Sequence, residues 1–211
     1  MKKLVLSLSL VAAIAMTSKA QEFGFKKSDV IVEGSFQSSN KNDKSAEVKT
    51  SKFNFTPKAG YFVTDKIAVG VELGFGQNKN TFTVNNEENI TKANKFAVGV
   101  FGRYYFLEVG SRFKTYAEVG VDYNNTRNEN EIAGNKVKMP KVNGFGVNGS
   151  VGANYFLSKN IAINFAFADV IAYNTSKVDV DGAKSVNEFN TNVNVFNNFF
   201  NSAQFGLTFK F

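Results

Sequence analysis

Apolar and polar residues alternate with a period of two through most of this 211-residue chain, and this pattern limits its fold more than any other feature. Each stretch of alternation lasts for about ten residues, which is typical of β-strands whose two faces meet different surroundings. The pattern is clearest over residues 52–63, where Phe53, Phe55 and Tyr61 share one parity and polar or small residues take the other. The chain is therefore predicted to be all-β.

Eight alternating segments are predicted to be strands. They cover residues 30–36, 52–63, 67–76, 95–106, 114–123, 145–155, 161–167 and 205–211. After the first 20 residues, no segment approaches the roughly 18 to 20 continuous apolar residues that a membrane-spanning helix requires. Disorder is excluded as well, because 23 phenylalanines give the chain far more aromatic surface than a disordered chain carries.

The connections between the predicted strands alternate in length. Three joins are short, at residues 64–66, 107–112 and 158–160. Four stretches rich in Asn, Lys, Ser and Glu are long, and they cover residues 37–51, 77–94, 124–142 and 174–194. We expect these four stretches to be solvated loops. Short turns at one end and long loops at the other are typical of outer-membrane barrels, whose periplasmic turns are short.

Parity alone does not reveal which face of the strands is the core. A soluble lipocalin-like barrel and a membrane barrel with its two faces reversed both fit the alternation. Small residues on the polar parity favour the membrane barrel, because they suit a narrow interior, whereas glycine only weakens a strand that faces water. These residues are Gly70, Gly74, Gly76, Gly99, Gly120, Gly152, Ala162 and Ala166.

Aromatic residues at both ends of the apolar parity also favour a membrane barrel. By the short turns they are Tyr61, Tyr104, Phe106, Tyr155, Phe209 and Phe211, and by the long stretches Phe36, Phe53, Phe75, Phe96, Tyr123, Phe145 and Tyr173. The two groups are separated by roughly 20 Å along the barrel axis, close to the apolar height of such barrels. The predicted fold is an eight-stranded antiparallel up-and-down transmembrane β-barrel.

The first 20 residues have the three parts of a secretory signal peptide. Lys2 and Lys3 form a basic start, residues 4–16 are mostly apolar, and Ser18 and Ala20 are small residues at the cleavage spacing. We expect cleavage after Ala20, which leaves residues 21–211 as the outer-membrane β-barrel domain. The chain has a formal net charge of +7, and loss of the leader reduces it to 22 basic against 18 acidic residues. This balance is too mild to indicate nucleic-acid binding.

The chain contains no His and no Cys. This composition excludes a Ser-His-Asp triad, a Cys nucleophile, a zinc site with His ligands and a disulfide bond. We expect no catalytic residues, no metal and no cofactor, and the protein is predicted not to be an enzyme.

The sequence resembles the small eight-stranded outer-membrane β-barrels of the OmpX and OmpA-membrane-domain type, most of all those of Bacteroidetes. The resemblance rests on residues 60–70 (GYFVTDKIAVG), on 102–106 (GRYYF) with 116–120 (YAEVG), and on 205–211 (FGLTFKF). It implies a Gram-negative outer membrane as the location and outer-membrane lipid as a partner. It also implies insertion by the barrel-assembly machinery, whose recognition signal is the aromatic-ended last strand. The residues of that signal are Phe205, Leu207, Phe209 and Phe211.

Charged residues on the predicted lumen-facing parity fall at similar distances from the short turns. They are Glu33, Lys58, Glu72, Arg103 and Glu118. They indicate one charged layer across the barrel, in which Arg103 is expected to neutralise Glu72 and Glu118. The layer is interpreted either as a gate or proton path, or as a salt-bridged plug, and the plug is favoured because side chains fill an eight-stranded barrel.

Two functions remain open from the sequence. The favoured one is a non-enzymatic, monomeric anchor with a plugged lumen that displays four surface loops for structural, adhesion or binding roles. The alternative is a narrow porin-like channel for small solutes. The four loop stretches carry nearly balanced charge, so the extracellular ligand is unknown.

Overall fold

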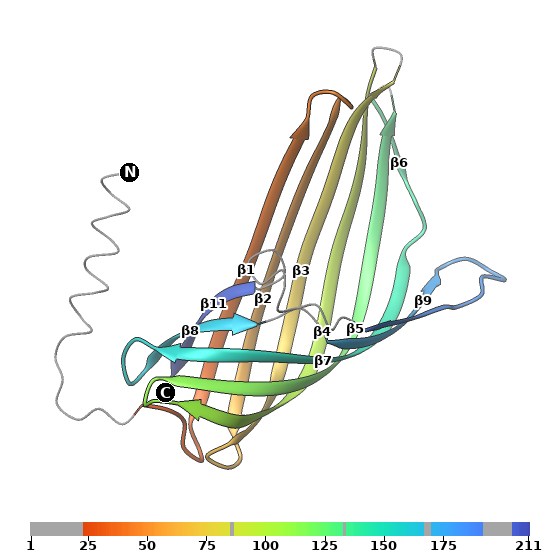
Figure 1. The fold of residues 1–211 in the computed structure, drawn as a ribbon. Coiled ribbons are helices and arrows are strands. Elements are labelled where there is room, and N and C mark those ends of the chain that lie inside the picture. Colours follow the sequence, from red (N-terminus) through yellow and green to blue (C-terminus); the bar gives the residue numbers. More distant parts are fainter. Residues whose placement is uncertain (1–22, 85–86, 133, 167–169, 192–203) are drawn as a thin grey trace.

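In the computed structural model, residues 23–84, 87–132, 134–166, 170–191 and 204–211 are described (Figure 1). The expected signal peptide and Phe167 of the seventh predicted strand lie outside these residues. The strands are β1 (Val30–Asp43), β2 (Val48–Phe62), β3 (Ile67–Val84), β4 (Glu87–Val109), β5 (Phe113–Ile132), β6 (Asn135–Lys138), β7 (Val142–Phe156), β8 (Ile161–Ala166), β9 (Ile171–Val178), β10 (Val186–Thr191) and β11 (Gln204–Lys210). Within the described ranges, no helix has the length and apolar character needed to cross a membrane.

Antiparallel pairing closes eight strands of the described chain into a ring. The order is β1-β2-β3-β4-β5-β7-β8-β11, and β11 pairs again with β1. The other strands extend this ring: β6 pairs with β5, β9 pairs with β7 beyond β8, and β10 pairs with β9. Ring neighbours follow one another along the chain, so the predicted eight-stranded antiparallel barrel is confirmed.

The pairing register fixes the stagger of the ring. From Phe36, successive partners on β2, β3 and β4 lead to Asn125 on β5. In the other direction, successive partners on β11, β8 and β7 lead to Thr115 on β5, ten residues earlier. Ten residues of about 3.3 Å each, over strands about 4.8 Å apart, correspond to a strand tilt of about 40°. Transmembrane barrels have this tilt.

Side chains alternate between the outside and the lumen, as the parity predicts. On β4, Val98 and Val100 are 44% and 57% exposed, whereas Phe101 and Arg103 are 3% and 1% exposed. The apolar parity therefore faces outward, and the parity rich in glycine and charged residues faces the lumen. This arrangement is that of a membrane barrel and the reverse of a lipocalin.

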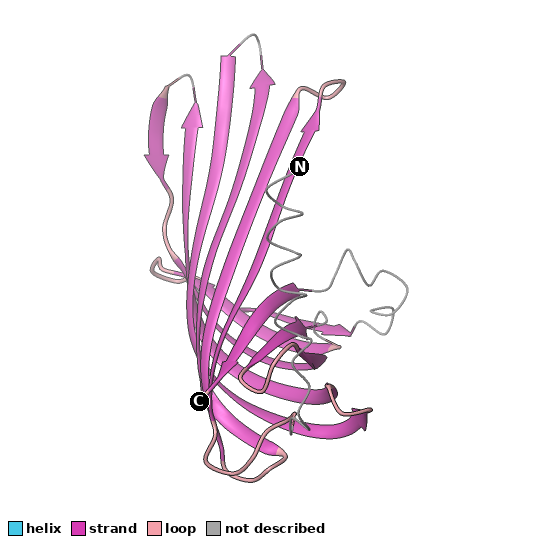
Figure 2. Cartoon of the chain, turned by 90° about the vertical axis from the view of Figure 1, so that its left-hand side faces the viewer, coloured by secondary structure: helices cyan, strands magenta, loops and turns pink. Residues whose placement is uncertain are grey.

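The four long polar stretches are mostly strands, so the prediction of long solvated loops was wrong. β1 and β2 stay paired up to Asp43 and Val48, and β3 and β4 stay paired up to Val84 and Glu87. The other two stretches contain β6 and β10, which pair back on β5 and β9. Both faces of these segments meet water, so pairing continues there without the apolar alternation of a half-buried strand. Figure 2 shows the long strands side by side, rising away from the C-terminus.

Candidate functional site

Five charged side chains from β1 to β5 meet inside the ring. Lys58 Nζ lies 2.7 Å from Glu72 Oε2 and 2.5 Å from Glu118 Oε1. Arg103 lies 2.6 Å from a carboxylate oxygen of Glu33 and 2.6 Å from one of Glu118. These five residues, the lumen charge layer, thus form one connected series of ion pairs in which Glu118 joins the two cations.

One ion pair differs from the sequence-based expectation. Arg103 pairs with Glu118 as expected, but its second partner is Glu33, and Glu72 pairs with Lys58 instead. The register explains the difference, because Arg103 lies opposite Ala68, four residues nearer the turn than Glu72. Because β4 extends to Val109, counting residues back from the β4–β5 turn places Arg103 farther along the barrel axis than it lies.

Arg103 is the most enclosed member of the layer, at 1% exposed, and Glu33 is 3% exposed. A buried charge is costly unless it is both paired and hydrogen-bonded. Arg103 meets this requirement, because it donates to Glu118 at 2.7 Å, to Glu33 at 2.9 Å and to the Tyr105 hydroxyl at 3.2 Å. Its guanidinium carbon also lies 4.0 Å from the ring centroid of Tyr116, a cation–π contact.

A hydrogen-bond circuit links the layer to the opposite wall. The Tyr105 hydroxyl donates to Asn154 Oδ1 at 2.8 Å, and Asn154 Nδ2 donates to the Thr208 hydroxyl at 2.8 Å. Thr208 donates in turn to Glu33 Oε2 at 3.2 Å. The circuit passes through β4, β7, β11 and β1, so it crosses the contact between the first and last strands of the ring. Buried networks in which each member has a partner make an interior rigid.

Aromatic side chains fill the lumen on the turn side of the layer. Ile31, Phe62 and Tyr105 pack there in a buried cluster. The N-terminal cap, which we define as residues 23–29, closes this end: the Phe25 ring centroid lies 4.4 Å from that of Phe62 and 4.8 Å from that of Tyr105. Lys210 Nζ donates to the carbonyl of Gly24 at 2.9 Å and holds the cap in place.

Sequence reasoning missed the N-terminal cap. Phe23 and Phe25 lie outside the alternating segments, so periodicity gives no signal for them. The signal that was present is compositional, namely two aromatic residues within five residues of the expected cleavage site. The centroid of the Phe23 ring also lies 4.4 Å from the guanidinium carbon of Arg112, a residue of the β4–β5 turn.

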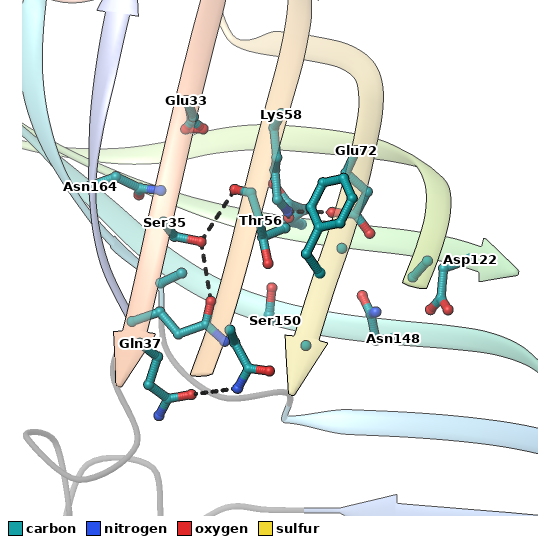
Figure 3. Close-up of a pocket in the computed structure, with 18 of the residues that line it drawn as sticks. Glu33, Ser35, Gln37, Thr56, Lys58, Glu72, Asp122, Asn148, Ser150 and Asn164 are labelled. Atoms are coloured by element: carbon teal, nitrogen blue, oxygen red, sulfur yellow. Dashed lines mark hydrogen bonds and ion pairs between the residues drawn. The ribbon is translucent and has the colours of Figure 1, made fainter. Parts of the chain in front are cut away.

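A cavity of about 530 Å³ lies on the loop side of the layer. The charged residues Glu33, Lys58 and Glu72 line it at its base (Figure 3). Its walls are mostly amides and hydroxyls, and they include Ser35, Gln37, Asn54, Thr56, Asn148, Ser150, Asn164 and Gln204. Among the described residues, no group of three or more His, Cys, Asp or Glu side chains is placed to hold a metal ion.

The model of the outer membrane protein beta-barrel domain matches residues 4–211. The chain belongs to this family. The predicted resemblance to small outer-membrane barrels is therefore confirmed, and the protein is a transmembrane β-barrel of the outer membrane. No curated protein matches the sequence significantly.

One solved structure supports the fold of this family member, and two others are also similar to it. OprG from Pseudomonas aeruginosa is 15% identical with a TM-score of 0.52, and the match covers 89% of this chain and 98% of OprG. Neisserial surface protein A is 17% identical with a TM-score of 0.44, covering 87% and 96%. Ail, the attachment invasion locus protein of Yersinia pestis, is 15% identical with a TM-score of 0.40, covering 88% and 99%.

The last strand of this outer-membrane barrel presents the predicted assembly signal on its outer face. The four residues of the signal are 40% to 73% exposed: Phe205, Leu207, Phe209 and Phe211. β11 pairs with β8 on one side and with β1 on the other. Backbone hydrogen bonds join Phe211 and Val30 in both directions, at 2.9 and 3.1 Å. β11, which carries the predicted signal, is thus also the strand that closes the ring.

Proposed function

We propose that this outer-membrane barrel is a non-enzymatic membrane anchor with a plugged lumen, which displays extended hairpins at the cell surface. In this proposal it acts as a monomer, reaches the outer membrane through a cleaved signal peptide and is inserted by the barrel-assembly machinery. The observation that carries the proposal is the Arg103 side chain, 1% exposed and ion-paired to Glu33 and Glu118 within the lumen.

Two further levels of packing support a closed lumen. The circuit from Tyr105 through Asn154 to Thr208 fills the opposite wall, and Phe25 packs over Phe62 at the turn end. A solute would have to displace ion pairs, hydrogen bonds and aromatic contacts in succession. Eight-stranded barrels have interiors that side chains fill, so this arrangement agrees with their size.

The projecting hairpins support a role at the surface. β3 and β4 stay paired for nine residues beyond Phe75 and Phe96, the aromatic residues of the upper girdle. At about 3.3 Å per residue and a tilt of about 40°, this is roughly 20 Å of sheet beyond the apolar band. A barrel used only as a pore needs no such sheet, whereas a display protein does.

Planar-bilayer recording on refolded protein tests the proposal. We expect no discrete conductance from the wild-type protein, and steady openings would contradict the anchor. A triple variant, Glu33→Ala, Arg103→Ala and Glu118→Ala, removes the Arg103 ion pairs of the lumen charge layer and is expected to give openings. The matched control, Ser35→Ala, Thr56→Ala and Ser150→Ala, changes only the cavity wall and should stay silent. Heat-modifiable migration in detergent gels verifies that each variant is folded.

The alternative is a narrow channel for small polar solutes. The cavity favours it, because about 530 Å³ of space reaches from the loop side down to the lumen charge layer. In this case the lumen charge layer acts as a gate. The wild-type protein should then conduct ions when the ion pairs of the layer exchange partners. Conductance that depends on voltage or pH in the wild-type protein, and that the cavity-wall control retains but the triple variant loses, would favour a channel gated by the layer.

A further inference from the structure

Six strands carry the same outward-facing triplet, in which an aromatic residue, a polar residue and a cation follow one another at every second position toward the loops. The triplets are Phe53-Ser51-Lys49 on β2, Phe75-Gln77-Lys79 on β3, Phe96-Asn94-Lys92 on β4, Tyr123-Asn125-Arg127 on β5, Phe145-Asn143-Lys141 on β7, where Lys141 directly precedes the strand, and Tyr173-Thr175-Lys177 on β9. We call the six basic residues, Lys49, Lys79, Lys92, Arg127, Lys141 and Lys177, the cation ring.

The cation ring lies at one level above the aromatic girdle. Positions two apart on a strand share a face, so each cation points outward like its aromatic partner. Four residues at about 3.3 Å each, on strands tilted by about 40°, place the ring about 10 Å beyond the girdle. Aromatic girdles mark the membrane interface. Flexible basic side chains extend back toward that interface, so the ring reaches the headgroup layer.

The cations of the ring lack partners within the described chain. None of the six forms an ion pair with a described residue, although Glu129 lies opposite Lys92 in the register. Lys79 and Lys92 are themselves directly opposite each other on β3 and β4. Like charges in directly opposed positions destabilise a sheet. An anion placed between them would remove this repulsion.

We propose that the cation ring binds the phosphate groups of lipid headgroups in the outer leaflet, with its strongest site at Lys79 and Lys92. The ring faces the surrounding lipid, lies at headgroup depth and is separated from the hydrocarbon by one polar residue on each strand. Arg127 lies diagonal to Lys92 on the next strand and adds a planar donor group that suits phosphate. On β1 the equivalent triplet is Phe36-Ser38-Asn40, so the ring is interrupted there.

Lipid titration of the detergent-refolded full chain tests the proposal. The probe is lipid A carrying its phosphates, and bound lipid is counted by native mass spectrometry. We expect the variant Lys49→Gln, Lys79→Gln, Lys92→Gln and Arg127→Gln to bind at least about tenfold more weakly, because each basic residue near an anionic surface contributes measurably. The matched control neutralises the same number of exposed lysines farther out, at Lys44, Lys136, Lys138 and Lys184, and should keep its affinity.

Three results would overturn the proposal. One is an equal loss in both variants, which means that total charge alone matters. Another is equal binding of dephosphorylated lipid A, which means that acyl chains carry the contact. The third is displacement of the lipid by inorganic phosphate at equal concentration, which means a free-ion site.

A stability measurement gives a second, independent test. Lys79→Gln with Lys92→Gln removes the repulsion between the two strands, so this double variant should unfold at higher urea than the wild type in maltoside micelles, which carry no phosphate. In micelles that also contain phosphorylated lipid A, the order should reverse, because only the wild type gains the lipid contact. The same order in both kinds of micelle would contradict a phosphate site between Lys79 and Lys92.

Discussion

Arg103 on β4 and Glu33 on β1 form an ion pair of 2.6 Å across the lumen, although two strands of the sheet separate them. An ion pair between ring neighbours ties two strands that the backbone already joins. This one ties strands that have no backbone contact with each other, so it fixes the cross-section of the barrel at this level.

The first prediction concerns the replacement of Arg103 by Met. Arg103→Met leaves Glu33 buried without its cation and leaves Glu118 paired with Lys58 alone, and removing one partner of a buried ion pair costs about 3 to 5 kcal/mol. Adding Glu33→Gln should recover part of this loss, whereas adding Glu72→Gln should not, because Glu72 keeps its pair with Lys58. Urea-unfolding midpoints in lipid vesicles measure all three variants. Small, additive effects would indicate a hydrated path in place of a dry layer.

The N-terminal cap gives a second prediction. Phe25→Ala removes the ring that stacks on Phe62 and should lower the free energy of unfolding by about 2 kcal/mol, the value for burying a large apolar side chain. Phe23→Ala should cost less, because its ring centroid lies 6.4 Å from that of Phe156 and its cation–π contact with Arg112 is worth about 0.5 to 1 kcal/mol. Hydrogen exchange at the start of β1 reports whether the cap opens. Equal effects of the two substitutions would show that Phe25 is not the anchor of the cap.

A third prediction tests the orientation of the strands. Val71 and Val100 face outward in the middle of the apolar band, so arginine at either position should cost about 2 to 4 kcal/mol. Val30→Arg, at the turn end of β1, should cost no more than about 1 kcal/mol. The free energy of unfolding in lipid vesicles measures this cost. Cysteines placed at positions 71 and 100 should resist water-soluble labels in intact membranes, and rapid labelling would reverse the assignment of the faces.

The last prediction separates assembly from stability. Phe211 is 73% exposed, so Phe211→Glu removes little packing while keeping the backbone bonds to Val30. We expect its urea midpoint after refolding to stay close to that of the wild type, and its level in the outer membrane of cells to fall clearly. Normal levels in cells would exclude Phe211 from the assembly signal.

Particular residues show how far the sequence predicts this structure. The parity of Val98, Val100 and Arg103 follows from the period of a strand, and the structure places these side chains on the expected faces. The predicted pairing of Arg103 with Glu72 was wrong because the turns of a tilted barrel do not lie at one level along the barrel axis. Val84 and Glu87 remain paired where the sequence suggested a loop, since a strand with water on both faces has no apolar period. Phe25 was missed because a capping segment has no period at all.

The hydrogen bond from Thr208 to Glu33 carries a consequence for the timing of folding. Thr208 belongs to the last strand and Glu33 to the first, so the circuit around Arg103 is complete only when the two ends of the chain meet. Before that moment, a half-built sheet in lipid would expose the charges of the layer to hydrocarbon without their full set of hydrogen bonds, which is costly. Partly inserted intermediates are therefore penalised, and insertion and closure are driven to occur together. The lumen charge layer therefore favours the completed barrel over partly closed forms.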